Sequence, residues 1–462
     1  MSSIEGFDFF PLHFDKNGVL QGALDELQQR AGAATDVIFI AHGFRNSEDD
    51  ATGLYTKFLH NFQANLGRPE LKALAQRNYA VAGVYWPSLA FQETFQQPSG
   101  GGVQAFGDDS SAQQQATVEQ QIEDLKAEVG PEERGKLDQA KQLLAALDSD
   151  SDAQDRFVSL VLSVLGESDL GAGEGVEEVR AQEGTKVLGK LRLPIIVSTQ
   201  QAAGTADAVG SVAGVGSTFA STFATGGDSS AEGGTQGLGS FFGSVLGAAG
   251  RFLNFTTWWV MKERSGVVGA NGVAQAVRDL KSKHAGLKVH LVGHSLGGRL
   301  MASCAKSLCA NPPLQPDSVT LLEAAFSHYG FSADAGLSDD PAKNVGFFRD
   351  VITAKICKGP LVATFSAMDT VVGHVYALAS RVAGDNVKAV GDANDPFGGI
   401  GRNGAQKTQE SITAELHDVG DPYKYQIGVV NNLDGSNHLI VDHSDVTNER
   451  VTYAFASSVA AT

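Results

Sequence analysis

Cysteine is scarce in this chain, with only Cys304, Cys309 and Cys357 among 462 residues. The number is odd, and the spacing fits no metal-ligand motif. The sequence therefore predicts three reduced thiols in the core rather than a disulfide framework or a cysteine-bound metal.

Long apolar runs are also missing. Residues 1–6 do not show the basic and then apolar pattern of a signal peptide, and no uninterrupted apolar stretch is long enough to span a bilayer. These absences favour a cytoplasmic protein, although secretion by a leaderless route would leave no trace of this kind.

Basic residues are fewer than acidic ones, 35 against 53, which gives a formal net charge of -18. Binding to nucleic-acid phosphates needs a basic surface, so this balance argues against a nucleic-acid partner. The content of 42% hydrophobic and 19% charged residues is ordinary for a soluble globular enzyme. At this length we expect either two domains or one domain with a large insertion.

The most informative stretch is Gly-His-Ser-Leu-Gly at residues 293–297. An apolar run short enough for a buried strand precedes it, and residues 299–306 have the pattern of a helix. A serine on such a tight turn is displayed above the sheet, and the flanking glycines avoid collisions that a Cβ would cause. Ser295 is therefore the candidate nucleophile. A chance match in a chain with 54 glycines is the alternative, and the strand and helix on either side weigh against it.

Residues 36–41 predict the first buried strand, which ends in His42, Gly43 and Phe44. In a serine hydrolase of this kind, the loop after an early strand and the residue after the nucleophile each supply a backbone N–H to the oxyanion hole. Phe44 and Leu296 are the candidates for these two donors. His42 is expected to brace the loop, and its alternative role is that of a catalytic base.

The character of the sequence changes in the middle of the chain. Gln-, Glu- and Asp-rich helical patterns give way, from about residue 200, to a segment dominated by Gly, Ala and Ser. We expect residues 1–94 and 251–462 to form the core and residues 95–250 to form an insertion. The insertion is either an inert surface element or, as we favour, a cap near the carboxyl edge of the sheet.

Apolar side chains in and after the glycine-rich segment support the cap. They are Phe219, Phe223, Phe241, Phe242, Leu246, Phe252 and Phe255. Leaving them in water would cost about 25 cal/mol per Å² of apolar surface. They are therefore expected to cover the active-site cleft or to meet a lipid or membrane surface, as a lid would.

Two further buried strands are predicted over residues 318–326 and 360–366. Asp369 follows the second, where the orienting carboxylate of a Ser-His-Asp triad is expected. Glu323 is the runner-up, although it lies within an apolar run and would be costly to bury unless paired.

The catalytic base is expected after the acid in the chain order Ser, Asp, His. His443 lies just before an apolar terminal helix predicted over residues 451–460, and it is preferred to His438. His417, in a polar helical pattern, is expected at the surface.

The chain carries His42-Gly43-Phe44, the Ser295 turn, Asp369 after a strand and His443 in this order. With these motifs it resembles the α/β-hydrolase superfamily, and in particular its esterase- and lipase-like serine hydrolases. Tyr-Trp-Pro-Ser at residues 85–88 adds to the resemblance, which does not extend to the insertion. It implies an α/β fold with a mostly parallel central sheet flanked by helices and carrying a large cap. It also implies a carboxylesterase or lipase-like activity with Ser295, Asp369 and His443 as the triad, a small-molecule or lipid ester as substrate, and no metal or organic cofactor.

Other functions stay open. A hydrolase of the same fold acting on phospholipids or amides would carry the same residues, whereas serine at the elbow argues against dehalogenase or epoxide-hydrolase chemistry. A non-catalytic protein that binds a membrane or a partner through the insertion is the second class, supported by the phenylalanines and by Trp258 and Trp259.

Overall fold

A computed structural model provides the structure of this protein. It describes residues 2–22, 24–88, 110–166, 170–192, 244–310, 312–384 and 391–462.

The chain folds around one sheet of nine strands in the order β1-β2-β4-β3-β5-β6-β7-β9-β8. Only the β1–β2 pair is antiparallel. The strands are β1 Ser2–Ile4, β2 Phe7–His13, β3 Asp36–Ala41, β4 Tyr79–Tyr85, β5 Lys288–His294, β6 Ser318–Leu322, β7 Leu361–Phe365, β8 Ser411–Glu415 and β9 Val430–Asp434. The predicted α/β class, with a mostly parallel sheet flanked by helices, is confirmed.

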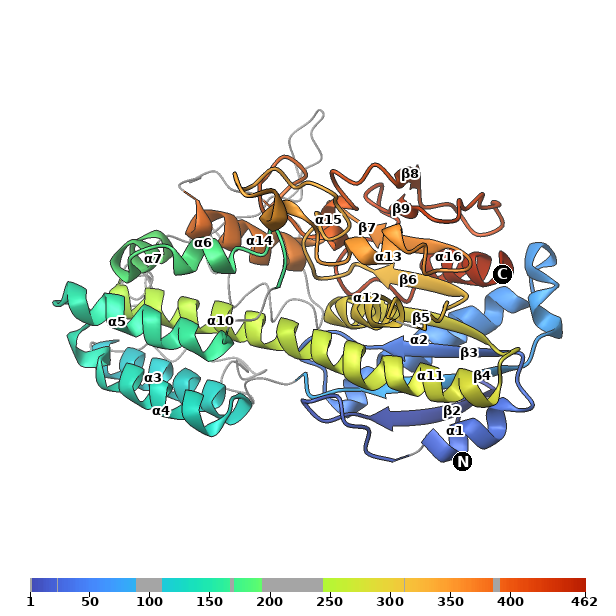
Figure 1. The fold of residues 1–462 in the computed structure, drawn as a ribbon, viewed down its shortest axis with the longest axis horizontal. Coiled ribbons are helices and arrows are strands. Elements are labelled where there is room, and N and C mark those ends of the chain that lie inside the picture. Colours follow the sequence, from blue (N-terminus) through green and yellow to red (C-terminus); the bar gives the residue numbers. More distant parts are fainter. Residues whose placement is uncertain are drawn as a thin grey trace, which may run out of the picture.

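Helices surround this sheet and continue beyond it (Figure 1). They are α1 Leu24–Ala31, α2 Glu48–Leu66, α3 Ser110–Glu128, α4 Pro131–Gln142, α5 Ser151–Leu162, α6 Val176–Arg180, α7 Gly184–Leu191, α10 Val245–Val267, α11 Ala274–Lys283, α12 Leu296–Leu308, α13 Arg349–Thr353, α14 Thr370–Ala383, α15 Ile400–Asn403 and α16 Glu449–Ala460. Among the helices of the described ranges, none combines the length and apolar character needed to cross a bilayer.

Both faces of the central strands are buried, which explains their continuous apolar runs. Successive side chains of a strand point to opposite faces, so Val37 and Phe39 of β3 join one core while Ile38 and Ile40 join the other. The first core includes side chains of α1, α11 and α12, and the second includes side chains of α2 and α16. This two-sided burial holds the strands in one register.

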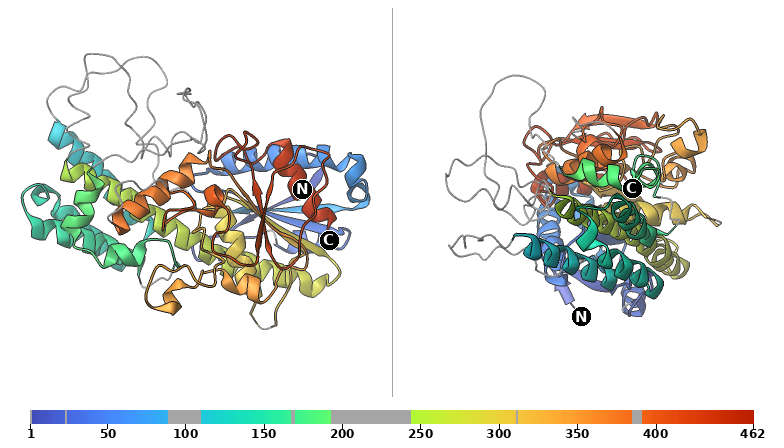
Figure 2. Two further views of the ribbon diagram at one scale, coloured as in Figure 1. Left: turned by 90° about the horizontal axis from the view of Figure 1, so that it is seen from above. Right: turned by 90° about the vertical axis from the view of Figure 1, so that its left-hand side faces the viewer.

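The helices α3 to α7 lie beside the sheet, and their buried side chains continue the first core (Figures 1 and 2). They lie on the side toward which the parallel strands point, opposite the end where Thr462 meets the start of β5. Helix α10 begins among these helices and continues through a π-helical turn, Val268–Val273, into α11 beside the sheet. The boundary expected at residue 250 therefore falls inside one continuous helix.

The helical part of the predicted cap is described, but most of its glycine-rich part, with Phe219, Phe223, Phe241 and Phe242, lies outside the described residues, which omit 193–243. Of the apolar side chains assigned to it, Leu246, Phe252 and Phe255 are described, and all three are buried in α10. The three cysteines are free thiols, with Cys304 and Cys357 buried as predicted and Cys309 partly exposed.

One local prediction was wrong, and two strands were missed. The stretch around His417 was expected to be helical, but β8 ends at Glu415 and His417 follows it in a loop, half-buried and stacked on Tyr423. The edge strand β8 and its neighbour β9 were not predicted, and β9 carries two asparagines that break the apolar pattern.

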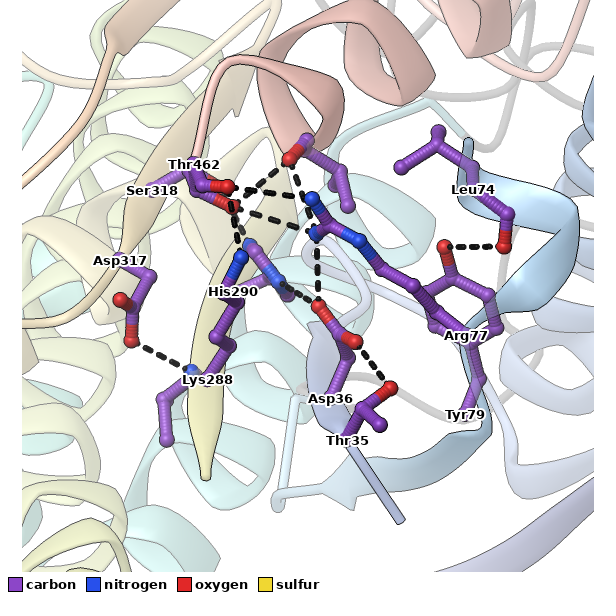
Figure 3. A network of polar contacts seen from close by, with 12 residues as sticks. Thr35, Asp36, Leu74, Arg77, Tyr79, Lys288, His290, Asp317, Ser318 and Thr462 are labelled. Atoms are coloured by element: carbon purple, nitrogen blue, oxygen red, sulfur yellow. Dashed lines mark hydrogen bonds and ion pairs between the residues drawn. The ribbon is translucent and has the colours of Figure 1, made fainter. Parts of the chain in front are cut away.

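A buried polar network closes the amino edge of the sheet, opposite the carboxyl ends of the strands (Figure 3). The carboxylate of Asp36 accepts hydrogen bonds from His290 at 2.9 Å and from Arg77 at 3.1 Å. The other ring nitrogen of His290 lies 2.8 Å from the hydroxyl of Ser318. The network thus links the amino ends of strands β3, β5 and β6.

Candidate active site

The tight turn predicted around Ser295 is present between β5 and α12. Ser295 has φ 57 and ψ -124, a strained conformation that a non-glycine residue adopts only where its surroundings hold it. Its N–H donates to the carbonyl of Leu322 at 3.0 Å, and its carbonyl accepts from the N–H of Ala325 at 3.0 Å. The loop after β6 therefore fixes the backbone of the candidate nucleophile.

The glycines of the motif are required by close backbone contacts. A Cβ on Gly293 would lie 2.2 Å from the carbonyl oxygen of Gly297, and a Cβ on Gly297 would lie 2.4 Å from that of Ala41. Contacts this short exclude any side chain, so strand β5, helix α12 and the end of β3 approach as closely as the predicted elbow demands.

His443 and Asp369, predicted as base and orienting acid, form a hydrogen bond. Nδ1 of His443 lies 2.8 Å from Oδ2 of Asp369, and both side chains are buried. Asp369 also caps α14, since its Oδ1 accepts the N–H of Val372 at 2.9 Å. Because the carboxylate is held from two sides, it fixes the proton of His443 on Nδ1 and leaves Nε2 as a proton acceptor.

His294, the residue before Ser295, connects the elbow to the histidine loop. Its Nε2 donates to the carbonyl of His443 at 2.8 Å, and the two rings lie 4.6 Å apart. Burial, together with the neighbouring His443, holds the pKa of His294 well below its usual range, so the ring is neutral. The sequence analysis gave this histidine no role, because its contact depends on a loop 149 positions away.

His443 contacts His294, the neighbour of Ser295 in the chain, and not Ser295 itself through a hydrogen bond. Among the described residues, no hydrogen bond joins the Ser295 hydroxyl to His443. Serine and base are often separated in ligand-free enzymes and move together when substrate binds.

The loop that was predicted to carry one oxyanion donor passes directly over the serine. A Cβ on Gly43 would lie 2.8 Å from the Cβ of Ser295, so only glycine fits, and Phe44 follows at once. Leu296 is the first residue of α12, where helix geometry leaves N–H groups without intrahelical acceptors. The residues predicted as main-chain donors, Phe44 and Leu296, therefore belong to the two segments that adjoin Ser295.

His42 has the contacts of a bracing residue. Its Nδ1 lies 2.9 Å from the carbonyl of Gly43, and its carbonyl accepts from the indole N–H of Trp86 at 3.0 Å. The rings of His42 and Trp86 are stacked. Burial lowers the pKa of His42 to about 4, which keeps it neutral.

The two runner-up residues are placed differently. His438 is exposed in the turn after β9, with a positive φ of 58, and contacts neither Ser295 nor Asp369. Glu323 is completely buried directly after β6, and among the described residues neither of its carboxyl oxygens has a hydrogen-bond partner. Within the described ranges, no three His, Cys, Asp or Glu side chains gather in a way that would hold a metal ion.

Comparisons with protein-family models, with curated proteins and with solved structures gave no match.

Proposed function

We propose that this protein is a serine hydrolase of the α/β-hydrolase fold that cleaves carboxylic esters through an acyl-enzyme intermediate. The observation that carries the proposal is the Asp369–His443 pair at the carboxyl edge of the sheet, beside a serine held in a strained turn. Strain of this kind persists at functional sites because the surroundings enforce it.

In the proposed mechanism, the hydroxyl of Ser295 attacks the ester carbonyl while Nε2 of His443 takes its proton. Asp369 holds the imidazole in the required tautomer and stabilises the imidazolium. The N–H groups of Phe44 and Leu296 receive the developing oxyanion. His443 then gives its proton to the leaving alcohol, which leaves an acyl group on Ser295.

Hydrolysis completes the cycle. A water molecule gives its proton to His443 as it attacks the acyl carbonyl, and the acid departs with return of the proton to Ser295. Because His294 is neutral, it places no second positive charge beside the imidazolium that forms at each step.

A series of nitrophenyl esters with short to long acyl chains tests the proposal. The wild type should hydrolyse at least one of them, and Ser295→Ala should lower kcat by about 10⁴-fold or more with the fold intact. Retention of more than about a tenth of the wild-type rate would overturn the assignment of Ser295. Matched nitroanilides in the same series would measure the preference for esters over amides.

A further inference from the structure

The proposed oxyanion loop, residues 42–46, is held by contacts with other segments. Its Arg45 has a φ of 58, a left-handed value that a residue with a side chain keeps only where its surroundings enforce it. The N–H of Arg45 donates to the carbonyl of Ser88 at 3.0 Å, and the N–H of Asn46 lies 3.3 Å from the Ser88 hydroxyl. These bonds fix the backbone that follows Phe44.

The side chain of Phe44 rests on helix α10. The rings of Phe44 and Trp258 lie 5.9 Å apart at an interplanar angle of 69°, which is the edge-to-face arrangement that aromatic pairs favour. Trp258 is buried, whereas Phe44 is partly buried and packs against the first core. One turn further along α10, Nζ of Lys262 lies 5.5 Å from the centre of the Trp258 ring. The buried tryptophan therefore supports the side chain of a predicted oxyanion donor.

A second contact from α10 reaches the oxyanion loop through the segment after β4. Arg264 is buried in α10 and donates to the carbonyl of Pro87, directly before Ser88, at 3.0 Å. The same guanidinium donates to the carboxylate of Glu128 at 2.7 Å and to its backbone carbonyl at 3.0 Å. Glu128 is the last residue of α3. Helix α10 thus contacts the oxyanion loop, the segment after β4 and the end of α3.

We propose that Trp258 is a positioning residue for the oxyanion hole, since its contact with the Phe44 ring sets where the Phe44 N–H lies. This inference rests on the proposed serine-hydrolase function. The loop passes close to the nucleophile, because a Cβ on Gly43 would lie 2.8 Å from the Cβ of Ser295. A small shift of Phe44 would therefore change the distance from its N–H to the oxyanion, and donors act only at hydrogen-bonding distance.

Trp258→Leu removes the ring and leaves the proposed triad in place. It should lower kcat about tenfold at unchanged KM, since a displaced donor weakens binding of the transition state more than binding of the ester. A trifluoromethyl ketone with a matching acyl chain is a second probe, because Ser295 adds to it and forms a hemiketal oxyanion. Its affinity should fall by about the same factor as kcat. Trp258→Phe keeps an aromatic ring, so both values should stay within about threefold of the wild type.

Trp259→Leu is the matched control, since it makes the same change at the next position of α10. The indole N–H of Trp259 donates to the carbonyl of Glu174 at 3.1 Å, and its ring lies 4.1 Å from that of Phe255. This variant should lose stability in urea unfolding and keep its kcat. Every kcat is expressed per site titrated with a fluorophosphonate, so that a smaller folded fraction is not counted as slower turnover.

Several results would overturn the proposal. An unchanged kcat per titrated site in Trp258→Leu, or an equal loss in Trp259→Leu, would show that Trp258 has a structural role only. A loss in Trp258→Phe as large as in Trp258→Leu would exclude the ring contact as the cause. A lower kcat with unchanged ketone affinity would place the effect outside the oxyanion hole.

Phe44→Leu keeps the proposal testable if Trp258→Leu fails to fold. It removes the other ring and keeps the N–H, so it must lower kcat and ketone affinity together, and unchanged values would contradict the proposal. The variants are compared only after the wild type has hydrolysed an ester and Ser295→Ala has not. Failure of the function and failure of the Trp258 proposal are therefore distinguished.

Discussion

Nδ1 of His443 lies 2.8 Å from Oδ2 of Asp369, although the two residues are 74 positions apart in the chain. Ser366, at the end of β7, supports this contact because its hydroxyl donates to the carbonyl of Ile440 in the histidine loop at 2.8 Å. The loop that carries the proposed base is thus tied to the strand that delivers the proposed acid.

His443→Ala should therefore be nearly as damaging to ester hydrolysis as Ser295→Ala, and the double variant should be little worse than either single one. Residues that act as a unit lose their effect together. The exposed His438 offers the matched control, and His438→Ala should keep most of the activity. If kcat/KM on one ester gave the opposite ranking of the two histidine variants, His438 and not His443 would be the catalytic base.

Glu323→Gln should make the protein more stable at pH 7. Burial and the negative charge of Asp369 raise the pKa of Glu323 in the folded state, so its contribution to stability is fully present below about pH 4.5 and is lost as pH rises toward the folded value. Glutamine avoids this loss. Urea unfolding should show a gain at pH 7 that vanishes near pH 4, whereas the exposed Glu26→Gln should show none at either pH. Equal stability of Glu323→Gln and wild type at pH 7 would contradict the raised pKa.

A buried ion pair fastens the helical insertion to the core. Lys262 of α10 donates to Glu174 of the insertion and to the hydroxyl of Tyr376 in α14, while Glu174 also accepts from the N–H of Ser327 at 2.8 Å. Removing one partner leaves the other charge buried, so Lys262→Met should lower the free energy of unfolding by about 3–5 kcal/mol.

The double variant Lys262→Met, Glu174→Gln checks this interpretation. Because no unpaired charge remains, it should lose less than the sum of the two single changes in urea unfolding. Strictly additive losses would show that the two side chains do not stabilise the fold as a pair.

Asp36→Asn should destabilise the protein by about 3–5 kcal/mol at pH 7, because it removes the anion that His290 and Arg77 share. Burial opposes ionisation of Asp36, but the hydrogen bonds from His290 and Thr35 and the nearby positive charges outweigh it and lower the pKa. Its contribution is therefore present above the ordinary value of 3.8 and is lost as pH falls further. The stability difference between wild type and variant should shrink below about pH 4, and a constant difference would contradict the ion pairing.

The sequence predicted those parts of the fold that are specified locally. Strand β3 matches its predicted bounds, and the Ser295 turn was recognised because glycine spacing and flanking apolar runs lie within a dozen residues. Strand β9 was missed, since its buried Asn431 and Asn432 are satisfied by Leu361 and Ala405 from distant segments. A polar residue with a long-range partner looks like a loop residue in the sequence alone.

Contacts between distant segments also limited the prediction of the candidate active site. The strand-end position of Asp369 and the late position of His443 were sufficient to nominate both residues. The neighbourhood of Glu323 and Asp369 depends on β6 and β7 lying side by side, with Leu322 paired to Thr364, and no sequence pattern records that pairing. Glu323 was therefore ranked as an alternative to Asp369, whereas in the structure both residues are fully buried and follow neighbouring strands of the sheet.

The most direct test of the proposed function is covalent labelling with a fluorophosphonate, which reacts with a serine only when an adjacent base and an oxyanion hole activate it. Mass spectrometry of the digested protein should find one adduct per chain, on the peptide that contains Ser295. Ser295→Ala should not be labelled, and His443→Ala should be labelled far more slowly than the wild type. An unlabelled wild-type protein, or an adduct on another serine that persists in Ser295→Ala, would contradict the assignment of this site as a serine hydrolase centre.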